Sequence, residues 1–138
     1  MLDAKLYLQE YGQKAKTAVV SLANSPESQR NDALKYLAEI IDNNKQEIYQ
    51  INKLDVQYAT EKGLSSSMVD RLVLNEKRVD DMTKGLYQLV DLKEYCNKVE
   101  SVYTRDDGLV IEKILVPLGV VAIIYESRPN VPVDAAGL

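Results

Sequence analysis

One loop near the end of the chain carries the side chains best suited to chemistry. It holds Glu126, Ser127, Arg128 and Asn130 directly after an unbroken apolar run, Val120–Ile124. Such a run is typical of a strand that is buried on both faces of a sheet. Ligands of open α/β sheets bind beyond the carboxyl ends of the strands. The position therefore favours a binding loop, while a solvated connector with a helix cap explains the same residues equally well.

The residues after this loop predict the start of a helix. Pro132 and Asp134 suit a first helical turn, and such a turn offers free N–H groups to phosphates or oxyanions. Too few residues follow Ile124 for a second parallel strand. We therefore expect the strand's neighbours to come from another copy or from a longer polypeptide, with association or partial disorder over residues 120–138.

The absence of histidine limits the chemistry that this chain can perform. It removes Ser-His and Cys-His nucleophile pairs and most zinc sites, and we expect no metal centre. The single cysteine, Cys96, rules out an intrachain disulfide. A low-pKa thiolate needs positive neighbours, and Lys93 and Lys98 are weak support for one. We therefore interpret Cys96 as structural.

Bulk composition predicts one ordinary globular domain. The 138 residues are 46% hydrophobic and 28% charged, and the formal net charge is −4. No basic stripe is present, which disfavours nucleic acid as a partner. No apolar run is long enough to span a bilayer, and the N-terminus lacks the pattern of a signal peptide. We therefore expect a cytoplasmic protein without a membrane partner.

Helical patterns fill residues 1–95. A first helix places apolar or small residues on one stripe: Ala4, Leu8, Tyr11, Ala15, Ala18 and Leu22. Ser25-Pro26-Glu27 then forms a helix start, with a hydroxyl N-cap and proline at the first position. The inner face of this second helix consists of Leu34, Leu37, Ala38 and Ile41.

Further breaks divide the rest of the helical region. We expect Asn43-Asn44 to interrupt the second helix. A third helix then follows, with the apolar or aromatic residues Ile48, Ile51, Leu54 and Tyr58, and stops at Gly63. Ser65–Ser67 can cap a short helix, and Asn75 can cap the next one, whose apolar residues are Val79, Met82, Leu86 and Leu89.

Two charged pairs lie on these helices. Asp80 and Asp81 are adjacent, so they point in different directions and form no dyad; a solvated face is the simpler interpretation. Asp70 and Arg71 could pair locally or reach a substrate, and we favour a surface or interdomain role.

The pattern changes to strands at about residue 98. Two runs rich in β-branched residues flank Asp107-Gly108, which is a strong hairpin signal. The sequence thus predicts a hairpin over about 98–116, followed by a strand, a loop and a helix start over 117–138.

Four stretches carry a resemblance to a known family. They are NKLDV (52–56), GLSSSMVDRLVLNEKRV (63–79), GLYQLVDL (85–92) and PLGVVAIIYESRPNVPVDAA (117–136). The chain resembles the N-terminal part of gamma-glutamyl phosphate reductases, in the aldehyde dehydrogenase superfamily. The connector 93–98 and the turn 105–107 depart from the family pattern.

The resemblance implies an α/β, aldehyde-dehydrogenase-like fold. Helices over 1–95 would precede an oligomerisation-type β-hairpin and the first strand of an incomplete dinucleotide-binding parallel sheet. Residues 1–138 would then be a partial N-terminal cofactor-binding domain, with the catalytic domain absent.

The resemblance also implies a site. Tyr125, Glu126, Ser127, Arg128 and Pro129 would line the NADPH cleft. The family binds its dinucleotide without a GxGxxG fingerprint, and this chain has none.

Asn130 matches the asparagine whose amide helps to hold the oxyanion. The nucleophilic cysteine of the family would lie downstream, outside these residues.

The function implied is that of an N-terminal fragment, inactive by itself. The parent would reduce gamma-glutamyl phosphate with NADPH to glutamate 5-semialdehyde, in proline biosynthesis, through thiolate attack and hydride transfer. It would form a homo-oligomer through hairpin 98–116. The alternative is a non-enzymatic helical assembly or regulatory module, which a stop codon directly after Leu138 would favour.

Overall fold

The computed structural model describes residues 3–126 and 128–138, and it divides into two compact units. The first unit combines the chain up to Glu27 with residues 93–122, and the second combines residues 28–92 with residues 123–138. Each unit therefore joins segments that are distant in sequence. None of the described helices is long and apolar enough to cross a membrane.

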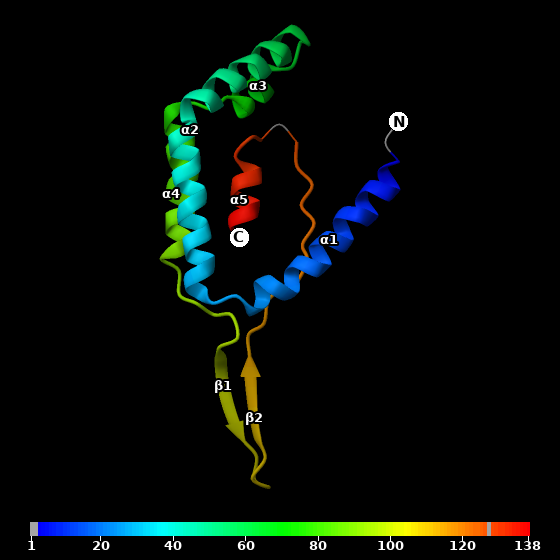
Figure 1. Cartoon of the computed structure of the whole chain (residues 1–138), viewed down its shortest axis with the longest axis vertical. Coiled ribbons are helices and arrows are strands. Elements are labelled where there is room, and N and C mark those ends of the chain that lie inside the picture. The colour runs from blue at the N-terminus through cyan, green and yellow to red at the C-terminus, as the bar shows by residue number, and fades with distance from the viewer. Residues whose placement is uncertain (1–2, 127) are drawn as a thin grey trace. The chain divides into compact units, whose positions relative to one another are not determined.

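Five helices and two strands make up the described chain (Figure 1). In chain order they are α1 (Ala4–Asn24), α2 (Glu27–Glu61), α3 (Ser66–Leu72), α4 (Glu76–Val90), β1 (Val99–Thr104), β2 (Val110–Ile114) and α5 (Val131–Gly137). The expected helix start near Pro132 is thus confirmed, as is the hairpin; the helices predicted within residues 1–95 are found between Ala4 and Val90.

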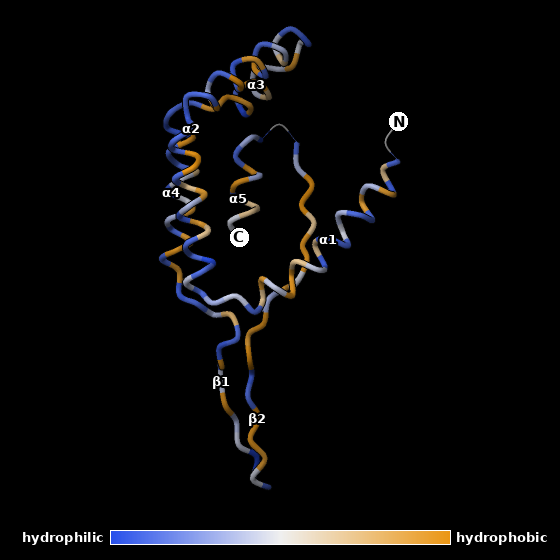
Figure 2. The backbone as a smooth tube through the Cα atoms, in the orientation of Figure 1, coloured by the Kyte–Doolittle hydropathy of each residue, from blue (hydrophilic) through white to orange (hydrophobic). Residues whose placement is uncertain are grey.

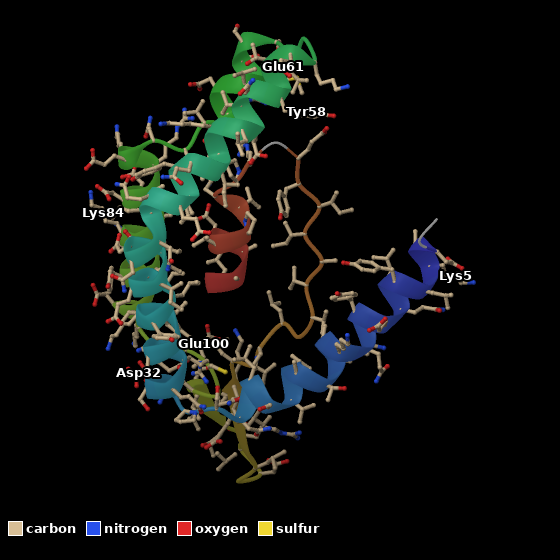
Figure 3. The ribbon with its side chains drawn as sticks, turned by 45° about the horizontal axis from the view of Figure 1, so that its top comes forward. Lys5, Asp32, Tyr58, Glu61, Lys84 and Glu100 are labelled. Atoms are coloured by element: carbon tan, nitrogen blue, oxygen red, sulfur yellow. The ribbon has the colours of Figure 1, made fainter. Side chains whose placement is uncertain are left out.

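The core of the second unit lies between α2 and α4. Ala38 and Ile41 of α2 pack against Val79 and Leu86 of α4, and Val133 of α5 packs onto the same cluster. Charged side chains such as those of Asp32 and Lys84 project from the outer faces of these helices (Figure 3). The inner faces predicted for residues 34–41 and 79–86 are therefore confirmed.

The predicted interruption at Asn43-Asn44 is wrong, because α2 is one helix of 35 residues. Asn44 stays inside it and donates from Nδ2 to the carbonyl oxygen of Ile40, at 2.7 Å. Asparagine costs a helix interior only a few tenths of a kcal/mol, roughly, and tertiary packing overrides such a cost.

Continuity also sets the buried face of the second half of α2. Of the apolar or aromatic residues named for the third helix, Ile48 packs at the core, but Ile51, Leu54 and Tyr58 are more than half exposed. The buried residues here are Asn52 and Ala59. They continue the 3.6-residue phase set by Ala38, whereas a new helix would have been free to choose another face.

Asn52 fastens the connector between α3 and α4 onto α2. Its side chain is 5% exposed, its Nδ2 donates to the carbonyl oxygen of Leu72 at 2.9 Å, and its Oδ1 accepts from the backbone N–H of Leu74 at 2.7 Å. Polar groups at this depth need such partners. One buried amide therefore positions the segment 72–74.

Caps confirm two expected helix boundaries. Gly63 adopts φ +74° after α2, a left-handed conformation that favours glycine. Asn75 accepts the backbone N–H of Arg78 on Oδ1 at 2.9 Å, which satisfies a free donor in the first turn of α4.

In the first unit, β1 and β2 form an antiparallel hairpin in which Tyr103 pairs with Ile111. Gly108 adopts φ +87° in the turn, as the Asp107-Gly108 signal predicts. Every residue of both strands is exposed. The stripe on α1 is likewise unburied among the described residues of that helix.

The run Val120–Ile124 does not form the expected strand in this structure. It has no regular secondary structure and pairs with no described strand. Figure 2 shows it as one of the most apolar stretches of the backbone, yet Ile124 is fully exposed. A strand is defined by its hydrogen-bonded neighbours, and no described segment supplies them.

Candidate functional site

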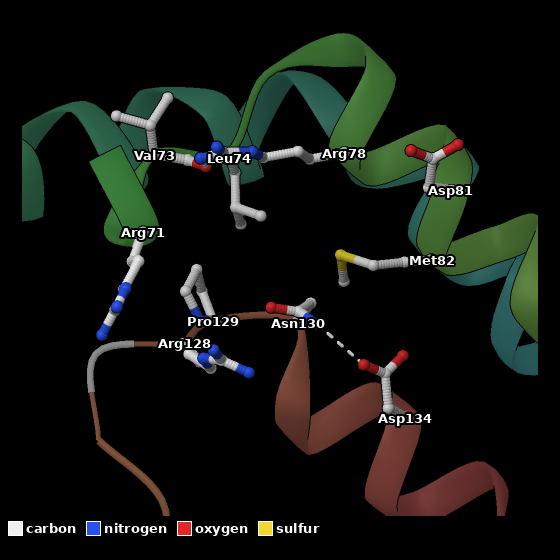
Figure 4. A pocket seen from close by; sticks show the side chains of 10 residues that line it. All are labelled: Arg71, Val73, Leu74, Arg78, Asp81, Met82, Arg128, Pro129, Asn130 and Asp134. Atoms are coloured by element: carbon white, nitrogen blue, oxygen red, sulfur yellow. Dashed lines mark hydrogen bonds between the residues drawn. The ribbon is translucent and has the colours of Figure 1, made fainter. Parts of the chain in front are cut away.

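A pocket of about 370 Å³ lies in the second unit, at the start of α5 (Figure 4). Its lining comes from α3, the α3–α4 connector, α4, the loop 128–130 and α5: Arg71, Val73, Leu74, Arg78, Asp81, Met82, Arg128, Pro129, Asn130 and Asp134. This volume is in the range of small-molecule sites.

The pocket gathers half of the site that the sequence predicts. Arg128, Pro129 and Asn130 line it. Tyr125 and Glu126 are exposed and lie outside its lining. Ser127 lies outside the described residues.

Asn130 is held by α5, the helix that it precedes. Its Nδ2 donates to Oδ2 of Asp134 at 2.7 Å, and its carbonyl oxygen accepts from the backbone N–H groups of Val133 and Asp134 at 3.0 and 3.1 Å. A carboxylate only accepts hydrogen bonds, so the amide nitrogen and not its oxygen must face Asp134. One N–H of this amide therefore remains for another acceptor.

Arg78 is engaged by the chain itself. Its guanidinium donates to the carbonyl oxygen of Val73 at 2.8 Å, to the carbonyl oxygen of Asp70 and to Oδ2 of Asp70 at 3.0 Å. These bonds join the end of α3 to the start of α4. Asp70 thus takes the local pairing that the sequence left open, although its partner is Arg78.

Arg71 and Arg128 differ from Arg78 in having no such anchor. Within the described part of the chain, neither guanidinium forms an ion pair or a hydrogen bond. Both side chains line the pocket and come from different elements, the end of α3 and the loop before α5. They give this end of the pocket two unneutralised positive charges.

Asp80 and Asp81 point in different directions, as expected. Asp80 Oδ1 lies 3.4 Å from Nζ of Lys45, which also contacts Asp42 at 3.2 Å. The hydrogen bond to Asp42, with a smaller effect of Asp80, holds the pKa of Lys45 above its ordinary value. Asp81 lines the pocket instead, so it is not merely part of a solvated face.

The sequence indicates Arg71 of α3 as a residue that could reach a substrate, but sequence reasoning missed the α4 side of the pocket. Arg78, Asp81 and Met82 follow one another at i, i+3 and i+4, which places them on one face of α4. That spacing was a signal for a shared face. Nothing local connected this face to the loop 128–130.

Cys96 lies in the connector between α4 and β1, within the first unit. It is free and partly exposed, and its backbone N–H donates to Oε1 of Glu94 at 2.5 Å. Nothing in its described surroundings favours a nucleophile.

The fit to a dinucleotide is partial. Tyr125 is half exposed, and Glu126 and Arg128 are exposed as well. A pocket of about 370 Å³ suits a small metabolite better than a whole dinucleotide. The described residues do not enclose a site of that size.

The known proteins most similar in sequence, among those compared, all carry the same name. Gamma-glutamyl phosphate reductase of Moorella thermoacetica is 44% identical over 137 residues, which are 99% of this chain and 33% of the relative. That of Clostridium botulinum is 47% identical over 127 residues, covering 92% of this chain and 31% of the relative. No protein-family model matches the chain.

Solved structures agree in fold. The crystal structure of gamma-glutamyl phosphate reductase from Thermotoga maritima matches with a TM-score of 0.89 at 41% identity, over 95% of this chain and 32% of that one. The Saccharomyces cerevisiae enzyme matches with a TM-score of 0.89 at 29% identity, over 94% of this chain and 33% of that one.

The chain matches the N-terminal portion of gamma-glutamyl phosphate reductases. It spans about a third of the length of these reductases. The structural match covers 95% of a chain that consists of helices and an antiparallel hairpin.

Proposed function

We propose that this chain is the N-terminal part of an NADPH-dependent reductase that converts gamma-glutamyl phosphate to glutamate 5-semialdehyde in proline biosynthesis. The observation that carries the proposal is 44% identity over 137 residues to a gamma-glutamyl phosphate reductase. The pocket supports it, because it brings Arg128, Pro129 and Asn130 to one small-molecule-sized space.

Asn130 would act on the substrate's acyl oxygen. Its amide has one N–H bound to Asp134 and one N–H free. As negative charge develops on the acyl oxygen, the free N–H stabilises it without reorganisation, since Asp134 already fixes the amide. The nucleophilic cysteine belongs to the rest of the polypeptide in this proposal.

The loop before α5 would form one wall of the cofactor site. NADPH, when bound, supplies the hydride of the reduction. Tyr125, Glu126, Ser127, Arg128 and Pro129 would line its site, and Arg128 and Pro129 would also line the neighbouring substrate pocket. The rest of the polypeptide would supply strands on both sides of Val120–Ile124. This run, whose apolar side chains are exposed here, would then form the first strand of the dinucleotide-binding sheet.

Hairpin 98–116 would join copies of the protein. Its strands expose Val102 at 59% and Tyr103 at 63%, and both strand edges lie free of described neighbours. Such edges pair readily with another chain. The proposal includes a homo-oligomer in the cytoplasm.

The first test is to sequence the gene beyond the codon for Leu138 and to express the complete polypeptide. We expect a further strand, a glycine-rich loop and a distant cysteine, and NADP-dependent turnover of glutamate 5-semialdehyde with phosphate. Asn130→Ala should lower kcat about 100-fold or more.

Residues 1–138 alone should not oxidise NADPH. Turnover by these residues alone contradicts the proposal. A stop codon after Leu138 together with no turnover favours the assembly module instead.

A further inference from the structure

The lining of the pocket is sorted by charge. Figure 4 shows Arg71 and Arg128 towards one end and Asp81 and Asp134 towards the other, with Asn130 between them. The two arginines of the positive end come from α3 and the loop before α5, and the two aspartates of the negative end come from α4 and α5. The separation is thus a property of how four elements meet.

The opposite charges in the pocket do not neutralise one another. Among the described residues, no ion pair joins Arg71 or Arg128 to Asp81 or Asp134. The third guanidinium, that of Arg78, is already bound by Asp70 and Val73. Asp134 contacts only the neutral amide of Asn130 through its side chain, in the part of the chain that is described. Both ends therefore keep free charge for a ligand.

We propose that this pocket orients the substrate end to end, with its phosphate at Arg71 and Arg128 and its α-ammonium at Asp81 and Asp134. The proposal rests on the proposed function. A guanidinium group donates two parallel hydrogen bonds to the oxygens of a phosphate, and a carboxylate accepts hydrogen bonds from an ammonium group. Gamma-glutamyl phosphate carries its phosphate at one end of a short chain and its α-ammonium at the other; the α-carboxylate on the same carbon would have to point away from Asp81 and Asp134.

The middle of the pocket suits the middle of that ligand. Asn130 lies between the charged ends, where the acyl carbonyl next to the phosphate would fall. Leu74, Met82 and Pro129 supply apolar lining for the methylene groups. A volume of about 370 Å³ is near the lower limit of small-ligand pockets, as an amino-acid derivative requires.

The acidic end is tested with Asp81→Asn in the complete polypeptide. The assay compares NADP-dependent oxidation of glutamate 5-semialdehyde with that of 5-oxopentanoate, which lacks the amino group. Wild type should prefer the first in kcat/KM, and Asp81→Asn should reduce this preference about fivefold, as for a partly exposed ion pair. Turnover of 5-oxopentanoate should fall less than turnover of glutamate 5-semialdehyde, because 5-oxopentanoate has no ammonium group to lose its partner.

Asp55→Asn is the matched control, because Asp55 is an exposed acid of α2 outside the lining. It should leave the preference as in wild type. An unchanged preference in Asp81→Asn, or an equal loss on both substrates, overturns the acidic end of the proposal.

The basic end is tested with Arg71→Gln. A phosphate at this end could come from the substrate or from the 2′-phosphate of NADPH, and the two differ in assay. We expect KM for inorganic phosphate to rise about fivefold, with the NADP-to-NAD preference unchanged. Lys84→Gln, an exposed cation of α4, is the control. A fall in the NADP preference with an unchanged phosphate KM overturns the proposal.

Binding separates this inference from the proposed function. Calorimetry on the complete polypeptide should find L-glutamate bound about fivefold more tightly than glutarate, and Asp81→Asn should abolish the difference. Turnover without this selectivity overturns the charge-sorted pocket alone. Selectivity without NADP-dependent turnover overturns the proposed function alone.

Discussion

The side-chain amide of Asn130 donates a 2.7 Å hydrogen bond to the carboxylate of Asp134, one turn further along α5. This bond fixes the orientation of the amide, with its nitrogen towards Asp134 and its oxygen away from it. α5 itself is docked on the core through Val133, and Gly137 lies against Leu86 and Leu89 of α4. The orientation of the proposed oxyanion donor therefore depends on the docking of a seven-residue helix.

Asp134→Ala should lower kcat of the complete polypeptide about tenfold, with a smaller change in the KM for phosphate. The amide of Asn130 then loses the acceptor that keeps its nitrogen in place, and a misplaced donor stabilises the oxyanion less. Steady-state kinetics of the semialdehyde oxidation measure the effect.

Asp134→Asn is the conservative comparison for this position. Its side-chain oxygen can still accept from Asn130, so it should recover most of the kcat that alanine loses. Equal kcat values for the two variants would exclude a positioning role for the carboxylate oxygen.

Asn52→Ala should lower the free energy of unfolding by about 3 kcal/mol. The change leaves the carbonyl of Leu72 and the N–H of Leu74, both partly buried, without their partner, and an unsatisfied group costs about 1–3 kcal/mol. Urea unfolding measures it. Asn44→Ala is the control, because Asn44 is exposed and bonds only within its own helix; it should change stability by less than about 0.5 kcal/mol.

Two glycines should respond to alanine with opposite signs. A Cβ on Gly137 would lie 2.9 Å from Cδ1 of Leu89 and 3.0 Å from Cδ2 of Leu86, so Gly137→Ala should destabilise the docking of α5 by about 1 kcal/mol. Gly85→Ala, inside α4 with nothing within 4 Å, should stabilise by about 1 kcal/mol. Hydrogen exchange over residues 131–138 should speed up in the first variant only.

Tyr49→Phe should raise the free energy of unfolding by about 1 kcal/mol. The Tyr49 hydroxyl is buried beside the core cluster and has no hydrogen-bond partner among the described residues. Removing an unpartnered buried polar group recovers its desolvation cost. Tyr36→Phe, at a position 65% exposed, should be neutral. A destabilised Tyr49→Phe would mean that the hydroxyl has a partner in solution.

Deprotonation of Lys45 should lower the stability of the folded chain at high pH. Its pKa is raised in the folded chain, chiefly by the hydrogen bond to Asp42 and further by Asp80. Because the pKa of Lys45 is higher in the folded than in the unfolded chain, its protonated form stabilises the folded state fully at pH values below the unfolded pKa of 10.5. This stabilisation is lost as the pH rises through the folded pKa. The thermal unfolding temperature of the wild type should therefore fall more steeply with pH above 10.5 than that of Lys45→Met. Parallel curves would contradict the assignment.

The sequence by itself determined the features that depend on neighbours a few residues away. Asn75 caps α4, Gly63 ends the long helix, and Asp107-Gly108 turns the hairpin, because each fixes local backbone geometry or a local hydrogen bond. The loop after Ile124 was also found from its position after an apolar run.

Tertiary structure decided what depends on partners distant in the chain. α2 passes through Asn43-Asn44 because packing along its length outweighs a small local preference, and this continuity buries Asn52 instead of Ile51. Arg71 and Asp81 join Asn130 in one pocket only because α3, α4 and α5 meet. Val120–Ile124 lacks strand structure for the same physical reason, since its sheet neighbours must come from elsewhere and no local pattern can provide them.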